Sequence, residues 1–70
     1  MNPDTQVVGK YLVTPFTKIS DTGDYLAAVS LRRGMHDRIF RFVPRFASPL
    51  GAMHYARTQG HEMAMAQQPA

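Results

Sequence analysis

The sequence contains no cysteine, so neither a disulfide nor a thiolate zinc site can supplement a small hydrophobic core. A chain of 70 residues forms one domain at most and buries only about 60% of the surface that it exposes when unfolded. Small chains without such supports can gain stability by forming oligomers, which makes a homodimer one expectation. The absence of cysteine also suits a reducing compartment, and we expect a cytoplasmic protein.

Long apolar runs and secretion signals are missing as well. No stretch of about 18 apolar residues is present that could cross a bilayer. Residues 1–6 lack the basic flank and the apolar centre of a signal peptide. We therefore expect no association with a membrane.

Groups suited to catalysis or metal binding are sparse. No serine with a partnering base stands out as a nucleophile. His36 and Asp37 are adjacent, and neighbouring residues on a strand point to opposite faces. His54 and His61 are seven positions apart, whereas helical metal motifs space their ligands by three or four. We expect neither an enzyme nor a bound cofactor or metal.

Positive charge is concentrated in one part of the chain. The 8 Lys and Arg residues outnumber the 5 Asp and Glu residues, which gives a formal net charge of +3. Five of these cations lie within fourteen residues, opposed there only by Asp37: Arg32, Arg33, Arg38, Arg41 and Arg45. Such a cluster predicts a local positive field that attracts polyanions. The alternative is a solvated sheet face whose arginines block edge pairing and maintain solubility.

Alternation and turn chemistry predict three antiparallel strands. The expected order is a disordered segment over 1–6, a strand over 7–19, a turn over 20–24, a strand over 25–32, a turn over 33–37 and a strand that ends at 46. Pro15 cannot donate to a ladder, so the first strand should be an edge, or be broken or bulged, at that point. Gly23 accepts a positive φ, and the Asp residues beside it favour turns. The two hairpins predict a meander.

A helix is expected to cover one face of this meander. Ser48 can cap it and Pro49 fits its first position, where a missing N–H costs nothing. Small and apolar residues follow at spacings of three and four, namely Ala52, Met53, Ala56, Gly60 and Met63. Gly60 could also end a first helical segment as a C-cap. The predicted fold is α+β, a three-stranded antiparallel sheet under a C-terminal helix, with one domain over 7–66 and a disordered tail over 67–70.

Period-two alternation in the last strand separates large apolar side chains from cations. Phe40 and Phe42 share one side, while Arg41 and Arg45 share the other. A sheet face left uncovered by the helix can enter a major groove or hold phosphates, which predicts DNA or RNA binding. The candidate contacts are Arg32, Arg41 and Arg45 as principal residues, with Arg38, Lys10 and Lys18 at the margins. Phe16 or Tyr11 is the aromatic residue expected to stack on a base.

The stretches Arg38–Phe42 and Ser48–Ala56 carry a resemblance to β-β-β-α DNA-binding domains. These include the arm-binding domains of phage-type tyrosine recombinases and the plant ethylene-response-factor domain. The resemblance covers roughly Tyr11 to Gly60 and implies a sheet backed by an Ala-rich helix. The acidic Glu-Ala run of those helices is absent, so no base-reading residue is carried over. The chain also resembles small stand-alone bacterial proteins of this layout.

A second reading is a protein-interaction module or a homodimer. An edge strand with unpaired amides can pair with another chain, and a helix bearing Met53, Met63 and Met65 could supply an apolar contact. The Gly23–Tyr25 hairpin followed by a strand and a helix resembles HicB-like antitoxins. Those antitoxins carry a Pro-Gly-rich segment after the second strand, whereas this chain has only Arg33 and Gly34.

Overall fold

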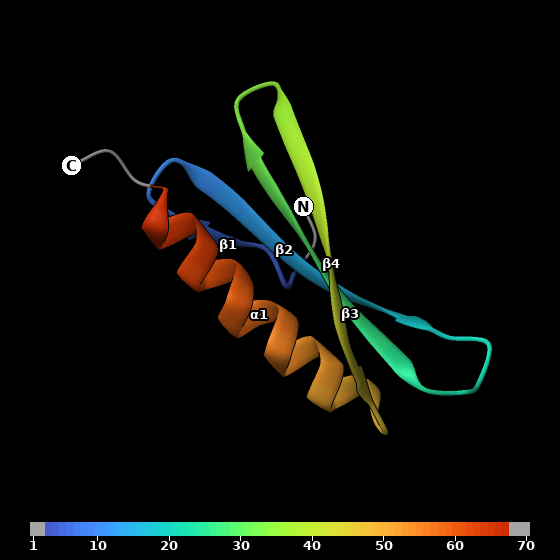
Figure 1. The fold of residues 1–70 in the computed structure, drawn as a ribbon. Helices are drawn as coiled ribbons and strands as arrows, with labels where there is room; N and C mark the ends of the chain where they lie inside the picture. The colour runs from blue at the N-terminus through green and yellow to red at the C-terminus, as the bar shows by residue number, and fades with distance from the viewer. Residues whose placement is uncertain (1–2, 68–70) are drawn as a thin grey trace.

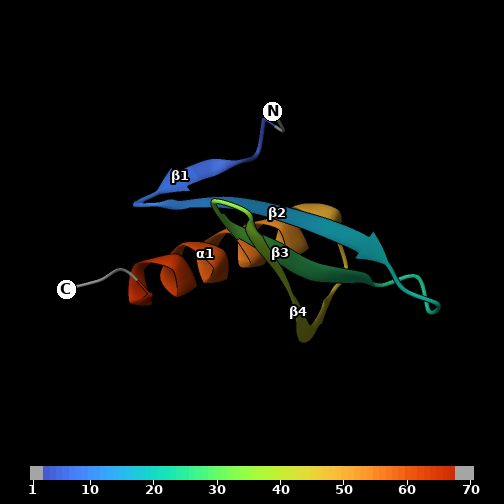
Figure 2. The ribbon, with the colours of Figure 1, turned by 90° about the horizontal axis from the view of Figure 1, so that it is seen from above.

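The computed structural model describes residues 3–67, which form one antiparallel sheet followed by one helix (Figure 1). The elements are β1 (Gln6–Val8), β2 (Tyr11–Ile19), β3 (Tyr25–Arg33), β4 (His36–Phe46) and α1 (Pro49–Ala66). The strands lie in the order β1-β2-β3-β4, and Figure 2 shows α1 against one side of the sheet. The predicted α+β class and the meander followed by a helix are confirmed, but the sheet has four strands instead of three.

The additional strand arises because the predicted strand over 7–19 divides at Gly9. That residue takes a φ of +61°, a left-handed conformation that glycine adopts without strain, and turns the chain back on itself. β1 then pairs with β2 from Gln6 opposite Val13 to Val8 opposite Tyr11. β-branched and aromatic residues continue on both sides of Gly9 and Lys10, and a single glycine within such a run was not interpreted as a turn, which is why the division was missed.

The segment 1–6 was expected to be disordered, but its residues 4–6 make contacts with β2 and α1. Gln6 belongs to β1, and the hydroxyl groups of Thr5 and Thr14 lie 2.8 Å apart in a hydrogen bond. Arg57 on α1 donates to the Asp4 carboxylate at 3.3 Å. Residues 1–2 lie outside the described residues, as does the predicted tail apart from Gln67.

Pro15 is buried in the middle of β2, opposite Val29 of β3. β1 pairs with β2 only from Tyr11 to Val13. Beyond Val13, β2 pairs only with β3 and is an edge strand. The missing N–H of Pro15 therefore costs no hydrogen bond to β1.

The core lies between α1 and the central strands, and small residues allow the helix to approach closely. The buried residues of α1 are Ala52, Ala56, Gly60 and Ala64. A Cβ atom added at Gly60 would lie 2.5 Å from Val29 Cγ2 and 2.8 Å from Val13 Cγ1. The helix continues through Gly60 to Ala66, so the C-cap interpretation of this glycine was wrong.

The start of α1 agrees with its sequence signal. The Ser48 hydroxyl accepts a hydrogen bond from the Gly51 amide at 3.2 Å, and Pro49 occupies the first helical turn. Tyr55 then packs against two aromatic rings of β4, with centroid separations of 5.3 Å to Phe42 and 5.2 Å to Phe46. These contacts attach the first half of the helix to the C-terminal half of β4.

β4 contains an irregularity that the alternation did not reveal. Ala28 pairs with Arg41, but Leu26 pairs with Arg45, so three residues of β4 lie opposite one residue of β3. Pro44, which has no N–H to donate, lies within this bulge. Because two residues are inserted, the alternation of sides is preserved, and Arg41 and Arg45 remain on the same side of the sheet.

Candidate nucleic-acid interface

The side of the sheet away from α1 is called the open face here. Residues opposite each other on antiparallel strands share a side, so the register defines its members. They are Val7 of β1, Leu12, Thr14, Phe16 and Lys18 of β2, Leu26, Ala28, Ser30 and Arg32 of β3, and Asp37, Ile39, Arg41 and Arg45 of β4. The open face therefore gathers cations from three strands.

These side chains form rows that cross the sheet. One row contains Phe16, Ala28 and Arg41, and a neighbouring row contains Lys18, Leu26 and Arg45. Neighbouring strands lie about 4.8 Å apart, so residues at the two ends of a row are separated by about 10 Å. Each of these rows thus has an aromatic or cationic side chain on β2 and an arginine on β4.

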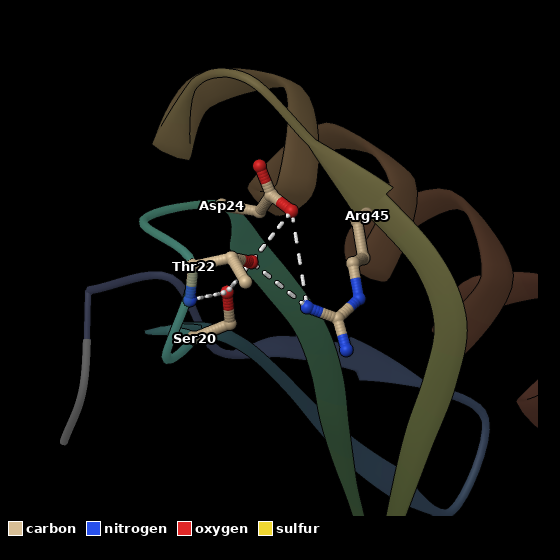
Figure 3. A network of polar contacts seen from close by, with 4 residues as sticks. All are labelled: Ser20, Thr22, Asp24 and Arg45. Carbon is tan, nitrogen blue, oxygen red and sulfur yellow. Dashed lines mark hydrogen bonds and ion pairs between the residues drawn. The ribbon is translucent and has the colours of Figure 1, made fainter.

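Arg45 is tied to the turn between β2 and β3 (Figure 3). Its Nη1 lies 3.8 Å from Asp24 Oδ2 and donates to Thr22 Oγ1 at 3.2 Å. Thr22 in turn donates to Asp24 at 3.0 Å, and the hydroxyl of Ser20 lies 3.1 Å from that of Thr22. About half of the Arg45 side chain remains exposed (53%), so it can still meet a ligand while its charge is partly balanced.

Arg32 is also engaged within its own hairpin. Its Nε donates to the Gly34 carbonyl at 3.3 Å, and it lies opposite Asp37 on β4. The Oδ1 atom of Asp37 accepts a hydrogen bond from the Ser30 hydroxyl at 2.5 Å. A carboxylate therefore lies beside Arg32 and reduces the positive potential at this end of the open face.

Arg41 and Lys18 differ from those two residues. Both side chains are exposed, and within residues 3–67 neither makes a side-chain hydrogen bond or ion pair. Arg41 lies beside Ala28, whose small side chain leaves the guanidinium group unobstructed. Of the predicted contacts, Arg41 is thus the arginine on the open face whose charge is most available to a ligand.

The structure places two predicted contacts away from the open face. Arg38 lies opposite Leu31, whose side chain is buried on the helix side. Lys10 lies in the turn between β1 and β2. The shared parity of Arg38 with Phe40 was the signal in the sequence that could have placed it on the helix side.

Tyr11 is likewise on the helix side, and Phe16 is the aromatic residue of the open face. The Tyr11 hydroxyl donates to Gln67 at 3.2 Å, and the Arg33 guanidinium lies 5.9 Å from the centre of its ring. Tyr11, Arg33 and Arg38 line a hollow of about 660 Å³ at the end of the β3–β4 hairpin. The basic side chains are therefore divided between two sides of the sheet.

The open face carries apolar side chains besides the predicted Phe16. Ile39 is 53% exposed and Val43, in the bulge of β4, is 90% exposed. Leu12, Phe16 and Leu26 are half-buried. The alternation in β4 assigns Ile39 to the side of Arg41, so this mixed character could have been read from the sequence.

Within residues 3–67, no group of three or more His, Asp or Glu side chains is placed to hold a metal ion. No helix there combines the length and the apolar character needed to cross a membrane.

Comparisons with known proteins add no assignment. A scan against protein-family models, a search of curated proteins and a search of solved structures each found no match.

Proposed function

We propose that the open face binds nucleic acid, DNA or RNA, mainly through phosphate groups. The observation that carries this proposal is the row formed by Phe16, Ala28 and Arg41. An exposed guanidinium without an intramolecular partner lies about 10 Å from a half-buried aromatic ring, with only a methyl group between them. A nucleotide offers both matching groups, a charged phosphate and a flat base.

The size of Ala28 supports this arrangement. The Ala28 side chain is 7% exposed and is much smaller than the side chains of Phe16 and Arg41 on either side of it. It therefore leaves space between them for a ligand. A base lying on Phe16 contributes about 1–3 kcal/mol of stacking. The Arg41 guanidinium can then bind the adjoining phosphate through charge-assisted hydrogen bonds.

The remaining cations contribute unequally in this proposal. Lys18 and Arg45 occupy the next row and extend the positive surface along the strands. Arg32 contributes less, because Asp37 lies opposite it. Arg38 and Lys10 lie away from the open face and add only to the long-range field that draws a polyanion toward the protein.

Fluorescence anisotropy with labelled single-stranded DNA, duplex DNA and RNA, repeated at several salt concentrations, tests the proposal. Arg41→Ala should weaken binding by about tenfold to a hundredfold, because a hydrogen bond to a charged group contributes about 1.5–3 kcal/mol. It should also reduce the slope of log K against log salt by about 0.7–0.9.

Arg38→Ala is the matched control, since it removes the same charge from the same strand on the other side of the sheet. It should leave the affinity within about twofold, as expected for long-range charge that salt screens. Equal losses in Arg41→Ala and Arg38→Ala, or no binding at about 50 mM salt, would show that the open face is not the site.

A further inference from the structure

The two edges of the sheet differ in how open they are to another strand. One edge is formed by the three residues of β1 and, beyond Val13, by β2, where Pro15 has no N–H to donate, whereas β4 forms the other edge with eleven residues. Within the described residues β4 pairs only with β3, so its outer backbone groups have no strand partner. Figure 1 shows the β3–β4 hairpin reaching past α1. A long open edge of this kind can accept a strand from a second chain.

We propose that β4 is the interface of a homodimer, in which two copies pair antiparallel through His36–Phe42 around a two-fold axis at Ile39. The dimer does not require nucleic-acid binding, but it shares Arg41 with the proposed site and places the Asp37 carboxylate of the second copy opposite that guanidinium. The bulge of β4 limits the residues that can pair, and the order of the charges selects this register among them.

The bulge limits which residues can pair. β4 follows a regular ladder with β3 from His36 to Arg41 and departs from it over residues 42–44. Pro44 cannot donate a hydrogen bond to a partner strand. Regular pairing therefore covers residues 36–41, and a partner strand is expected on this part of β4. An antiparallel pairing centred on Ile39 uses all of these residues and extends past them only to Phe42, which lies opposite His36 of the second copy.

The charges complement each other in that same register. Residues two positions on either side of the axis lie opposite each other, so Asp37 of one copy faces Arg41 of the other, twice in the dimer. Asp37, Ile39 and Arg41 all belong to the open face, which places each of these pairs on one side of the joined sheet. Shifting the axis by one residue to Phe40 would instead place Arg41 opposite Ile39.

Apolar contacts add to these charge pairs. Ile39 is 53% exposed in the single chain and would lie against its own copy at the axis. On the helix side, Arg38 of one copy lies opposite Phe40 of the other, where a guanidinium can contact a ring face. Among the described residues of one chain, the largest fully buried side chains are those of Val13, Val29 and Pro15, so added apolar burial is a substantial gain.

A single introduced cysteine tests the register, because the chain has none of its own. Directly opposed residues in antiparallel strands have Cα atoms about 4.5–5.5 Å apart, within the usual range for a disulfide. Ile39→Cys should therefore form a disulfide-linked dimer under mild oxidation. Val43→Cys is the control: its position is 90% exposed but does not lie on the axis. Equal cross-linking of both variants, or none of Ile39→Cys, would overturn the proposal.

Reversal of charge tests the pairing by a second route, read as mass against concentration by light scattering in the absence of nucleic acid. Arg41→Asp should weaken the dimer about tenfold by placing two carboxylates opposite each other in each of the two pairs. Combining it with Asp37→Arg should restore the dimer, because both pairs are then reversed. Lys18→Asp makes the same charge change on β2 and should leave the dimer intact.

Failure of the dimer is distinguishable from failure of nucleic-acid binding. A chain of 7.9 kDa at every concentration overturns the dimer, whatever the anisotropy experiment shows. If Ile39→Cys cross-links but the protein does not bind nucleic acid, the dimer is supported and the proposed function is overturned. Failure of the double charge reversal to restore the dimer would rule out the Asp37–Arg41 pairing, since circular dichroism checks that each variant is folded.

Discussion

The two faces of the sheet differ in the size of the side chains that determine their structure: small residues of α1 on the helix side and long side chains on the open face. On the helix side, glycine and alanine allow α1 to pack closely on β2 and β3, and Gly60 leaves no room for a Cβ atom beside Val13 and Val29. On the open face, long side chains such as Arg41 and Lys18 extend into solvent. The comparison indicates that stability depends on the first face and that the second is free to serve binding.

The largest effect should come from breaking the close approach on the helix side. Gly60→Leu places a bulky group where even a Cβ atom would lie 2.5 Å from Val29 Cγ2. Overpacking usually costs about 1–3 kcal/mol and occasionally more, and a loss of about 3 kcal/mol in the free energy of unfolding is expected. Urea denaturation followed by circular dichroism measures it.

His61→Leu introduces the same side chain at the next position of α1, which is exposed. It should change the free energy of unfolding by no more than about 0.5 kcal/mol, as is usual for surface substitutions. If both leucine variants were equally stable, the close approach at Gly60 would not be what holds the helix on the sheet.

An intermediate effect should follow from changing the aromatic residue of each face. Phe16→Leu on the open face should weaken binding of single-stranded nucleic acid by about tenfold, since stacking contributes about 1–3 kcal/mol per base. Tyr11→Leu on the helix side should leave that affinity unchanged. Anisotropy titrations measure the affinities of the two variants, each shown to be folded. A larger loss of affinity in Tyr11→Leu would mean that the base stacks on the helix side and would contradict the proposal.

The smallest effect concerns the link between the open face and the β2–β3 turn. Asp24→Asn removes the carboxylate that partly balances Arg45. Because the ion pair is half exposed, the free energy of unfolding should fall by less than about 1 kcal/mol. The affinity for nucleic acid at low salt should rise by several-fold, because Arg45 then carries an unbalanced charge toward phosphate.

High salt provides the control for this variant. Screening should bring the affinities of Asp24→Asn and the unchanged protein together as the Debye length shortens. A gain in affinity that persisted at high salt would mean that the substitution alters the shape of the turn and does not act through charge.

Local chemistry in the sequence was sufficient for several parts of this fold. Ser48 and Pro49 predicted where α1 begins, and Gly23 with its Asp neighbours predicted the β2–β3 turn, because caps and turns depend on residues a few positions apart. Alternation likewise predicted that Arg41 shares a side with Arg45. These features need no knowledge of distant segments.

The candidate site was predicted less completely. Arg32, Arg41, Arg45 and Lys18 were expected on one face and the structure places them there, but it moves Arg38 and Lys10 elsewhere. The partners that balance Arg45 come from a turn more than twenty residues earlier in the chain, and no local pattern indicates them.

Sequence alone determined the class of the fold, the start of the helix and the basic alternation of β4, since each follows from side chains close together along the chain. Only the tertiary structure decided that Gly60 lies inside the helix and does not end it, because the reason is its contact with Val13 and Val29 on other strands. It also decided which arginines have partners and that β4 has a free edge. Such properties depend on which distant segments meet, and that is settled by packing.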